Sequence, residues 1–324
     1  MTSATPPVRQ STSGSRLLRV AAQFPLATFL ILGFSLAYAL ALLWGLAYHG
    51  VIPGGGLAAA LHIAPDELTG GAVVLALFPA ALFATWAASG RVGVRSLFRR
   101  AFHWRVSPGW WLTVLLGLPV LTVSLALLMG DQLRSIDVPS FLASQLMLLL
   151  VNFIVINLWE EVAWTGLFQT RLEERHNWLV AALLTAIPFA AIHLPLQFFI
   201  DQPVTPSSLA AAFGLYLLLG LLVRPLLAVF RRGTGDSLLL VGLLHSVFNR
   251  TNNENGIAAT LLEGDARQLA MLIAVVLLTV VTAVVVRSRL SRQYGAELAK
   301  RSRTAAVSRT ARTRLGTAER RGVA

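Results

Sequence analysis

The sequence predicts an all-α, polytopic membrane protein with about eight transmembrane helices, and three observations lead to this fold class. Of its 324 residues, 56% are hydrophobic and only 13% are charged. The mean hydropathy is +0.68. The apolar residues also fall in long blocks that short polar segments separate. Blocks of this length suit helices that cross a bilayer, where backbone groups must bond to one another rather than to water.

Composition excludes several kinds of chemistry. The chain contains no cysteine, so disulfides, thiolate catalysis and cysteine-bound metals are excluded. Its net charge is +12, but the arginines cluster beside apolar blocks. This placement is typical of cytoplasmic loops and of contacts with anionic lipid. We therefore expect membrane lipid, and no nucleic acid, as a partner.

The chain divides into two tails and one membrane domain. Residues 1–20 predict a disordered cytoplasmic tail, residues 21–286 a transmembrane helical domain, and residues 287–324 a basic, disordered cytoplasmic tail. The segment 237–248 is short for a span, so we expect it to be buried among other helices. The other seven spans are expected at approximately 25–48, 72–89, 109–129, 141–171, 178–200, 207–230 and 269–286.

Charge predicts the orientation of these helices. Arginines crowd the connection 91–105, and Arg224, Arg231 and Arg232 come near the end of the sixth span. Arginine-rich loops stay in the cytoplasm, so both regions should lie on that side. The sequence thus predicts a multi-pass protein of the cell membrane with both termini in the cytoplasm.

Polar residues inside the apolar blocks are the candidates for chemistry. Glu160 and Glu161 are adjacent in the fourth span, where each ionisable side chain costs roughly 2.5–3.5 kcal/mol on insertion scales. Adjacent helical residues diverge by about 100°, so one glutamate can face a cavity while the other fixes a neighbouring helix. His245 and Asn249 are four residues apart and share a helix face.

Position along the chain brings a third group to the glutamates. Glu160 and His193 are equally distant from the polar turn at His176 and Asn177, which joins two antiparallel helices. The two side chains should therefore lie at the same depth and meet. We expect the active site in a buried cavity among helices 4, 5 and 7.

Two kinds of chemistry suit these residues, and the sequence leaves both open. Glu160 can act as general base on a water molecule, while His245 and Asn249 stabilise the resulting oxyanion. Alternatively, Glu160, His193 and His245 can bind Zn²⁺ or another divalent metal. The non-catalytic interpretation is hydrogen bonding between helices for each histidine, and a buried ion pair of the glutamates with Arg171 or Arg224. Asn157, one turn before Glu160, is interpreted as a packing residue that can also support the site.

The ordered set resembles the motifs of the CPBP family of intramembrane proteases, which includes CAAX prenyl endopeptidases and the bacteriocin-processing or immunity proteins of the Abi group. That family has two glutamates followed by three residues and an arginine, then Phe-x-x-x-His, then His-x-x-x-Asn or Asp. Here the motifs are Glu160 to Thr165, Phe189 to His193 and His245 to Asn249, within a core of about 145–250. The resemblance implies water activated by Glu160 and His193, with His245 and Asn249 holding the oxyanion or a metal.

One residue departs from the family pattern. Thr165 stands where the family has arginine, a residue that would share a helix face with Glu161 and orient it. Either Arg171 replaces that arginine or activity is reduced. Our leading hypothesis is an intramembrane endopeptidase acting on a peptide or protein substrate at the membrane. The alternatives are a noncatalytic scaffold or immunity protein and a proton-coupled transporter.

Overall fold

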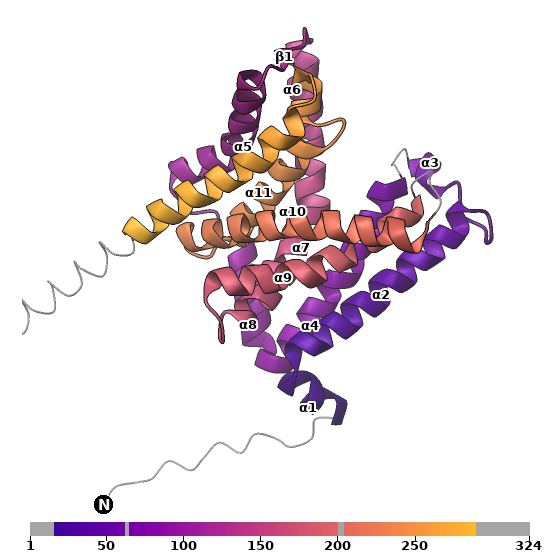
Figure 1. Cartoon of the computed structure of the whole chain (residues 1–324). Helices are drawn as coiled ribbons and strands as arrows, with labels where there is room; N and C mark the ends of the chain where they lie inside the picture. Colours follow the sequence, from indigo (N-terminus) through magenta and orange to yellow (C-terminus); the bar gives the residue numbers. More distant parts are fainter. Residues whose placement is uncertain (1–15, 62–64, 200–203, 290–324) are drawn as a thin grey trace, which may run out of the picture. The chain divides into compact units, whose positions relative to one another are not determined.

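The computed structural model describes residues 16–61, 65–199 and 204–289. It confirms the all-α fold class, with a single two-stranded pairing in the described part of the chain (Figure 1). Residues 16–20 of the predicted N-terminal tail are helical, and the rest of that tail lies outside the described residues, as does the C-terminal tail from residue 290.

Seven of the described helices are long and apolar enough to cross a membrane, so the chain is an integral multi-pass membrane protein. They run over Pro25–Tyr48, Leu68–Ala101, Pro108–Leu128, Val138–Leu172, Trp178–Phe198, Pro206–Gly233 and Arg267–Arg289. The segment that the sequence marked as short forms a buried helix of 15 residues, Leu238–Asn252. The prediction that other helices would enclose it is borne out by its burial.

The individual elements are as follows. The N-terminal part contains α1 (Arg16–Gln23), α2 (Pro25–Tyr48), α3 (Leu57–Leu61), α4 (Pro65–Ala101), α5 (Pro108–Leu128) and β1 (Gln132–Leu133). The fourth span consists of α6 (Val138–Val151), η1 (Asn152–Asn157), α7 (Leu158–Ala163), η2 (Trp164–Gln169) and α8 (Thr170–Leu172). Then come α9 (Trp178–Ile192), η3 (Leu194–Phe199), α10 (Pro206–Gly233), α11 (Leu238–Asn252), α12 (Ile257–Leu261) and β2 (Leu262–Glu263).

Local sequence sets where the helices begin. Proline occupies the first turn of α2, α5, α6 and α10, where a missing N–H costs nothing. The Asn177 side chain accepts hydrogen bonds from the backbone of Leu179 and Val180, so α9 begins at the polar turn that the sequence indicated. Ser237 caps α11 by accepting from the Leu240 N–H at 3.2 Å. α4 bends at Gly90, whose φ of 60° is cheap only for glycine.

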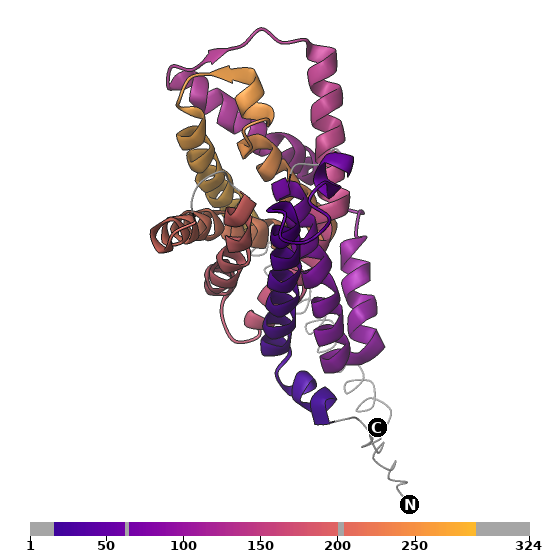
Figure 2. The ribbon, with the colours of Figure 1, turned by 90° about the vertical axis from the view of Figure 1, so that its right-hand side faces the viewer.

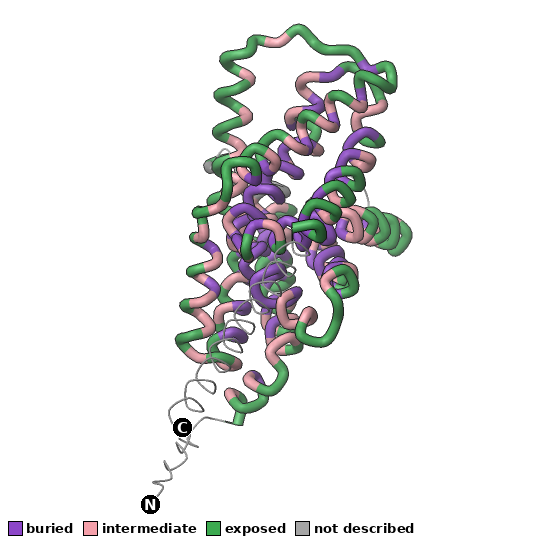
Figure 3. The backbone as a smooth tube through the Cα atoms, turned by 90° about the vertical axis from the view of Figure 1, so that its left-hand side faces the viewer, coloured by how far each residue is buried: buried purple, intermediate pink, exposed green. Residues whose placement is uncertain are grey.

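α7 lies at the centre of the packing, against α4 and α11, while α9 packs on α10 and α2 on α4 (Figures 1 and 2). Buried residues gather in this central region, and the outer helical faces are exposed (Figure 3). Every residue of α6 is exposed or half-buried, and α6 stands at the edge of the bundle (Figure 2). The exposed outer faces carry Leu, Val and Ile, as a lipid environment requires.

Two sets of contacts define opposite ends of the bundle. At one end, Arg100 at the end of α4 bonds to Asp236, just before α11. At the other end, β1 after α5 pairs antiparallel with β2 after α12. α5 and the α11–α12 segment therefore connect the same two ends. α11 is not among the seven candidate spans, so the eighth span expected at 237–248 stays a prediction.

Candidate active site

The two glutamates lie on α7, between two π-helical turns. The turns η1 and η2 flank this short α-helix, and such turns occur frequently at functional sites. The backbone of α11 approaches α7 closely at Gly242, because a Cβ atom added there would lie 2.8 Å from the Cα of Leu158. Glycine at this position lets α11 bring His245 and Asn249 to the glutamates.

Glu160 faces both histidines, and its side chain is nearly fully buried. Its Oε1 atom lies 3.9 Å from Nε2 of His193, and its Oε2 atom lies 3.8 Å from Nδ1 of His245. Asn157 donates a hydrogen bond from Nδ2 to Oε2 at 3.2 Å. The structure therefore brings Glu160 and His193 together, as the sequence predicted.

His193 ends α9 and is held by its own helix. Its Nδ1 atom lies 2.7 Å from the carbonyl oxygen of Phe189. A carbonyl only accepts, so Nδ1 carries the hydrogen, and in the neutral ring Nε2 is an acceptor that faces Glu160. The ring also packs against Tyr216 of α10, and the His193 side chain keeps 25% of its surface exposed. His193 thus stands at the accessible edge of the cluster.

His245 lies deeper and bonds to the second glutamate. Its Nδ1 atom is 2.9 Å from Oε1 of Glu161, so the ring N–H donates to that carboxylate. One helical turn further on, Asn249 donates from Nδ2 to Oδ1 of Asn157 at 3.3 Å, and Ser246 donates to the same oxygen at 2.9 Å. Asn157 therefore joins Asn249 and Ser246 to Glu160.

Glu161 is fully buried beside Arg224 of α10. Nη1 of Arg224 donates to both carboxylate oxygens, at 2.8 and 2.9 Å. Nη2 of Arg224 donates to the Thr165 hydroxyl at 2.8 Å and to Oε1 of Gln169 at 3.1 Å. Thr165 also donates to Glu161. The two glutamates thus diverge as their helical geometry predicts: Glu160 faces His193, whereas Glu161 bonds to Arg224 of α10, and His245 lies near both.

Two sequence-based expectations need correction here. Arg171 does not replace the motif arginine, since it pairs with Glu174 and Ser89 near the protein surface. Arg224 does not mark the cytoplasmic end of a span, because it is completely buried and bonded to Glu161. Of the two ion-pair partners considered for the glutamates, Arg224 is the one present.

Sequence reasoning missed two members of the site, Ser246 and Gln169, and considered Arg224 only as one of two possible ion-pair partners. Arg224 had a usable signal, because it lies inside the apolar run 221–230, and an ionisable side chain in such a run indicates function. Gln169 lies two helical turns after Glu161, on the same face. Ser246 carried no signal beyond its position next to His245.

Within the described part of the chain, no group of three His, Asp or Glu side chains is arranged to hold a metal ion. His245 uses Nδ1 to donate to Glu161, which leaves only Nε2 as a possible ligand atom. Glu160, His193 and His245 do not form such a group in this arrangement, and metal binding by them stays a prediction.

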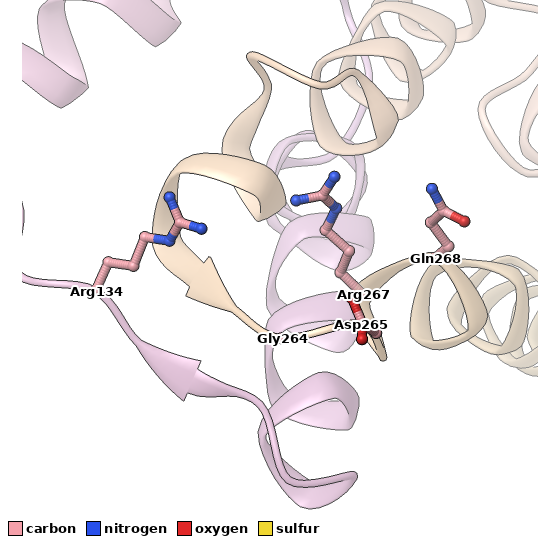
Figure 4. Close-up of a pocket in the computed structure, with 5 residues that line it drawn as sticks. All are labelled: Arg134, Gly264, Asp265, Arg267 and Gln268. Carbon is pink, nitrogen blue, oxygen red and sulfur yellow. The ribbon is translucent and has the colours of Figure 1, made fainter.

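A pocket of about 380 Å³ lies elsewhere, at the end of the bundle where β1 and β2 pair. Its lining residues are Arg134, Gly264, Asp265, Arg267 and Gln268 (Figure 4). Arg267 also pairs with Glu254 at 3.0 Å. This polar, open site contains none of the motif residues.

One family of known proteins matches the part of the chain that contains the site. Residues 142–251 match the family described as type II CAAX prenyl endopeptidase Rce1-like. This segment contains all three motifs, and the resemblance to the CPBP family is thereby confirmed. Residues 142–251 are therefore similar to Rce1-like domains of CAAX-type intramembrane proteases, and the buried cluster of Glu160, Glu161 and His245 in this segment is consistent with a catalytic site. A search of curated proteins finds no match to the chain.

Proposed function

We propose that the protein is an intramembrane endopeptidase that hydrolyses a peptide bond with water activated by Glu160 and His193. The observation that carries this proposal is the facing pair of acceptors, Oε1 of Glu160 and Nε2 of His193, 3.9 Å apart. This separation is too long for a direct hydrogen bond and suits a water molecule that donates to both groups. The partial exposure of His193 gives a substrate access to that water.

The reaction follows from these positions. Glu160 accepts a proton from the water as its oxygen attacks the carbonyl carbon of the scissile peptide bond. A tetrahedral oxyanion forms, and Asn249 has a second N–H with which to stabilise it. His245 can donate to the oxyanion from Nε2 when both ring nitrogens carry hydrogen. Glu160 then passes the proton to the amine nitrogen as the carbon–nitrogen bond breaks, and the carboxylate is restored.

The same topology supports the proposed orientation. The Arg100–Asp236 end of the bundle carries the arginine-rich connection 91–105, which the positive-inside rule assigns to the cytoplasm. With α11 counted as an eighth crossing beside the seven candidate spans, we propose that both termini lie on that side. The substrate class that the family description suggests is a prenylated CAAX protein.

The test uses the full-length protein in liposomes with two internally quenched CAAX peptides of one sequence, one farnesylated and one not. Glu160→Gln should lower kcat by about 10²-fold or more, because a positioned general base contributes at least that much. Glu174→Gln makes the same chemical change on the surface and should leave cleavage unchanged.

Two results would contradict the proposal. If Glu160→Gln cleaves at the wild-type rate, Glu160 is not the base. If the wild-type protein cleaves neither peptide and instead takes up solute in a pH-dependent manner that Glu160→Gln abolishes, the transporter interpretation replaces the hydrolase. Cleavage of the farnesylated peptide alone would support a prenyl-dependent substrate.

A further inference from the structure

Arg224 is a buried charge whose presence requires a reason. It sits within α10 between apolar residues, and none of its side chain is exposed. An arginine at the centre of a membrane helix costs about 2.5–3.5 kcal/mol on insertion scales, so its retention needs a specific partner. The partner is Glu161, whose two carboxylate oxygens both accept from Nη1.

The surroundings of Arg224 show which position it serves. Glu161, Thr165 and Gln169 are spaced four residues apart and present oxygen atoms to one guanidinium group. Thr165 is the middle residue of the three, and its hydroxyl lies 2.8 Å from Nη2 of Arg224. The guanidinium is therefore in contact with the position at which the related motif carries its arginine.

We propose that Arg224, supplied by α10, takes over the role of the missing motif arginine at position 165 and is a positioning residue for Glu161. This inference rests on the proposed function. Arg224 reaches no substrate atom and acts through Glu161, which accepts the hydrogen bond from Nδ1 of His245 at 2.9 Å. Loss of Arg224 would free Glu161 to move and would disturb the orientation of His245.

The inference explains why Thr165 is a small hydroxyl residue. Thr165 is fully buried, and its hydroxyl donates to Glu161 while it accepts from Arg224. An arginine at position 165 would bring a second guanidinium to the same carboxylate, and two like charges at one buried site repel strongly. Positions 165 and 224 must therefore change together, and Thr165→Arg alone should damage the protein.

The experiment exchanges the two side chains. Full-length variants Arg224→Thr, Thr165→Arg, the double exchange Thr165→Arg/Arg224→Thr and Arg224→Lys are reconstituted in liposomes with the farnesylated peptide as the probe. The control is Arg171→Leu, which removes an arginine from the same region without contact to Glu161. The readouts are kcat, KM and the melting temperature in detergent.

Each single variant at 165 or 224 should lose kcat by about 10²-fold, the effect of a catalytic group displaced by about 1 Å, and should melt at a lower temperature. The exchange should recover most of both losses. Arg224→Lys keeps the charge but cannot bond to Glu161, Thr165 and Gln169 together, so it should lower kcat by about tenfold while KM stays unchanged. Arg171→Leu should behave as the wild type.

Several results would overturn the proposal. Wild-type kcat in Arg224→Thr or in Arg224→Lys would show that Glu161 needs no such partner. A folded exchange variant that stays as inactive and as unstable as the single variants would show that the two positions are not equivalent. If the exchange variant does not fold, the kcat of Arg224→Lys alone decides whether the proposal holds.

Failure of the proposed function gives a different pattern. If the wild-type protein cleaves nothing, or if Glu160→Gln cleaves normally, the protease assignment fails. The exchange is then judged by melting temperature alone. Recovery of stability in the double variant supports the pairing of positions 165 and 224, and lack of recovery contradicts it.

Discussion

Two arginine–carboxylate clusters lie along the same helical segment, and they differ in their access to water. The core cluster consists of Arg224, Glu161, Thr165, Gln169 and His245, and its central ion pair has no exposed surface. The edge cluster consists of Arg100, Arg231, Asp236, Glu173 and Thr170, and 47% of the Asp236 side chain is exposed. Arg100, Arg231 and Glu173 of the edge cluster are largely buried too, so the two clusters differ mainly in the exposed carboxylate of Asp236.

The clusters are joined through the backbone of η2 and α8. Thr170 of the edge cluster donates to the carbonyl oxygen of Thr165, and Arg100 donates to the carbonyl oxygen of Gly166. The edge cluster thereby ties α4, α8, α10 and the start of α11 together at one end of the bundle. A charge lost at the edge can be replaced by water, whereas a charge lost in the core leaves its partner unpaired. The burial of each cluster, rather than its number of hydrogen bonds, should therefore decide how much stability is lost when one of its charges is removed.

The largest effect is expected from Glu161→Gln, which removes the core carboxylate and keeps its shape. Arg224 would then be a buried charge without a counter-ion, which costs about 3–5 kcal/mol. The melting temperature in detergent should fall strongly, and raising the salt concentration should not change the difference, because a sealed pair is little screened. A loss no larger than that at the edge cluster would remove the distinction between the two clusters.

An intermediate effect is expected from Asp236→Asn, the same change from carboxylate to amide at the edge. Asp236 has a φ of 71°, a conformation that asparagine also tolerates, so the backbone need not change. Arg231 would keep its bond to Glu173, and water reaches the exposed side chain at position 236, so the loss should be about 1 kcal/mol. The difference from wild type should shrink at high ionic strength, and a salt-independent loss would mean that this cluster is sealed as well.

The smallest effect is expected from Glu174→Gln, which changes the pair of Glu174 with Arg171. Both side chains are partly exposed, with 56% of the Glu174 side chain accessible. Such pairs contribute about 0.5 kcal/mol or less, so the melting temperature should not change measurably. A clear fall in melting temperature would show that the effects of the three carboxylate-to-amide changes do not follow the exposure of the side chains.

Much of this arrangement could be predicted from the sequence because it depends on position along a helix. The equal distances of Glu160 and His193 from the turn at Asn177 set their common depth, and adjacent glutamates on a helix must diverge. The spacing of His245 and Asn249 placed both on one face of α11. These features follow from helical geometry, so the spacing of the residues in the sequence is enough to predict them.

The role of Arg224 could not be derived in the same way. No helical spacing relates residue 224 to residue 161, since they lie on helices whose contact depends on packing across the bundle. Its nearness to Arg231 and Arg232 also made it look like a cytoplasmic marker. The approach of α11 at Gly242 and the bonds of Ser246 to Asn157 arise from tertiary packing and could be recognised only in three dimensions.

The two π-helical turns around α7 have a consequence for sequence length rather than for charge. Each such turn accommodates an extra residue compared with an α-helical turn, so the helical segments on either side of it largely keep their relative phase. Deleting one residue from α7 ahead of Glu160, where no widened turn absorbs the change, would rotate Glu160 and Glu161 by about 100° relative to the preceding helix. The fourth span would still be apolar and long enough to cross the bilayer, yet the two carboxylates would leave His193 and Arg224. The length of this helix, counted in single residues, is therefore as much a part of the site as the side chains it carries.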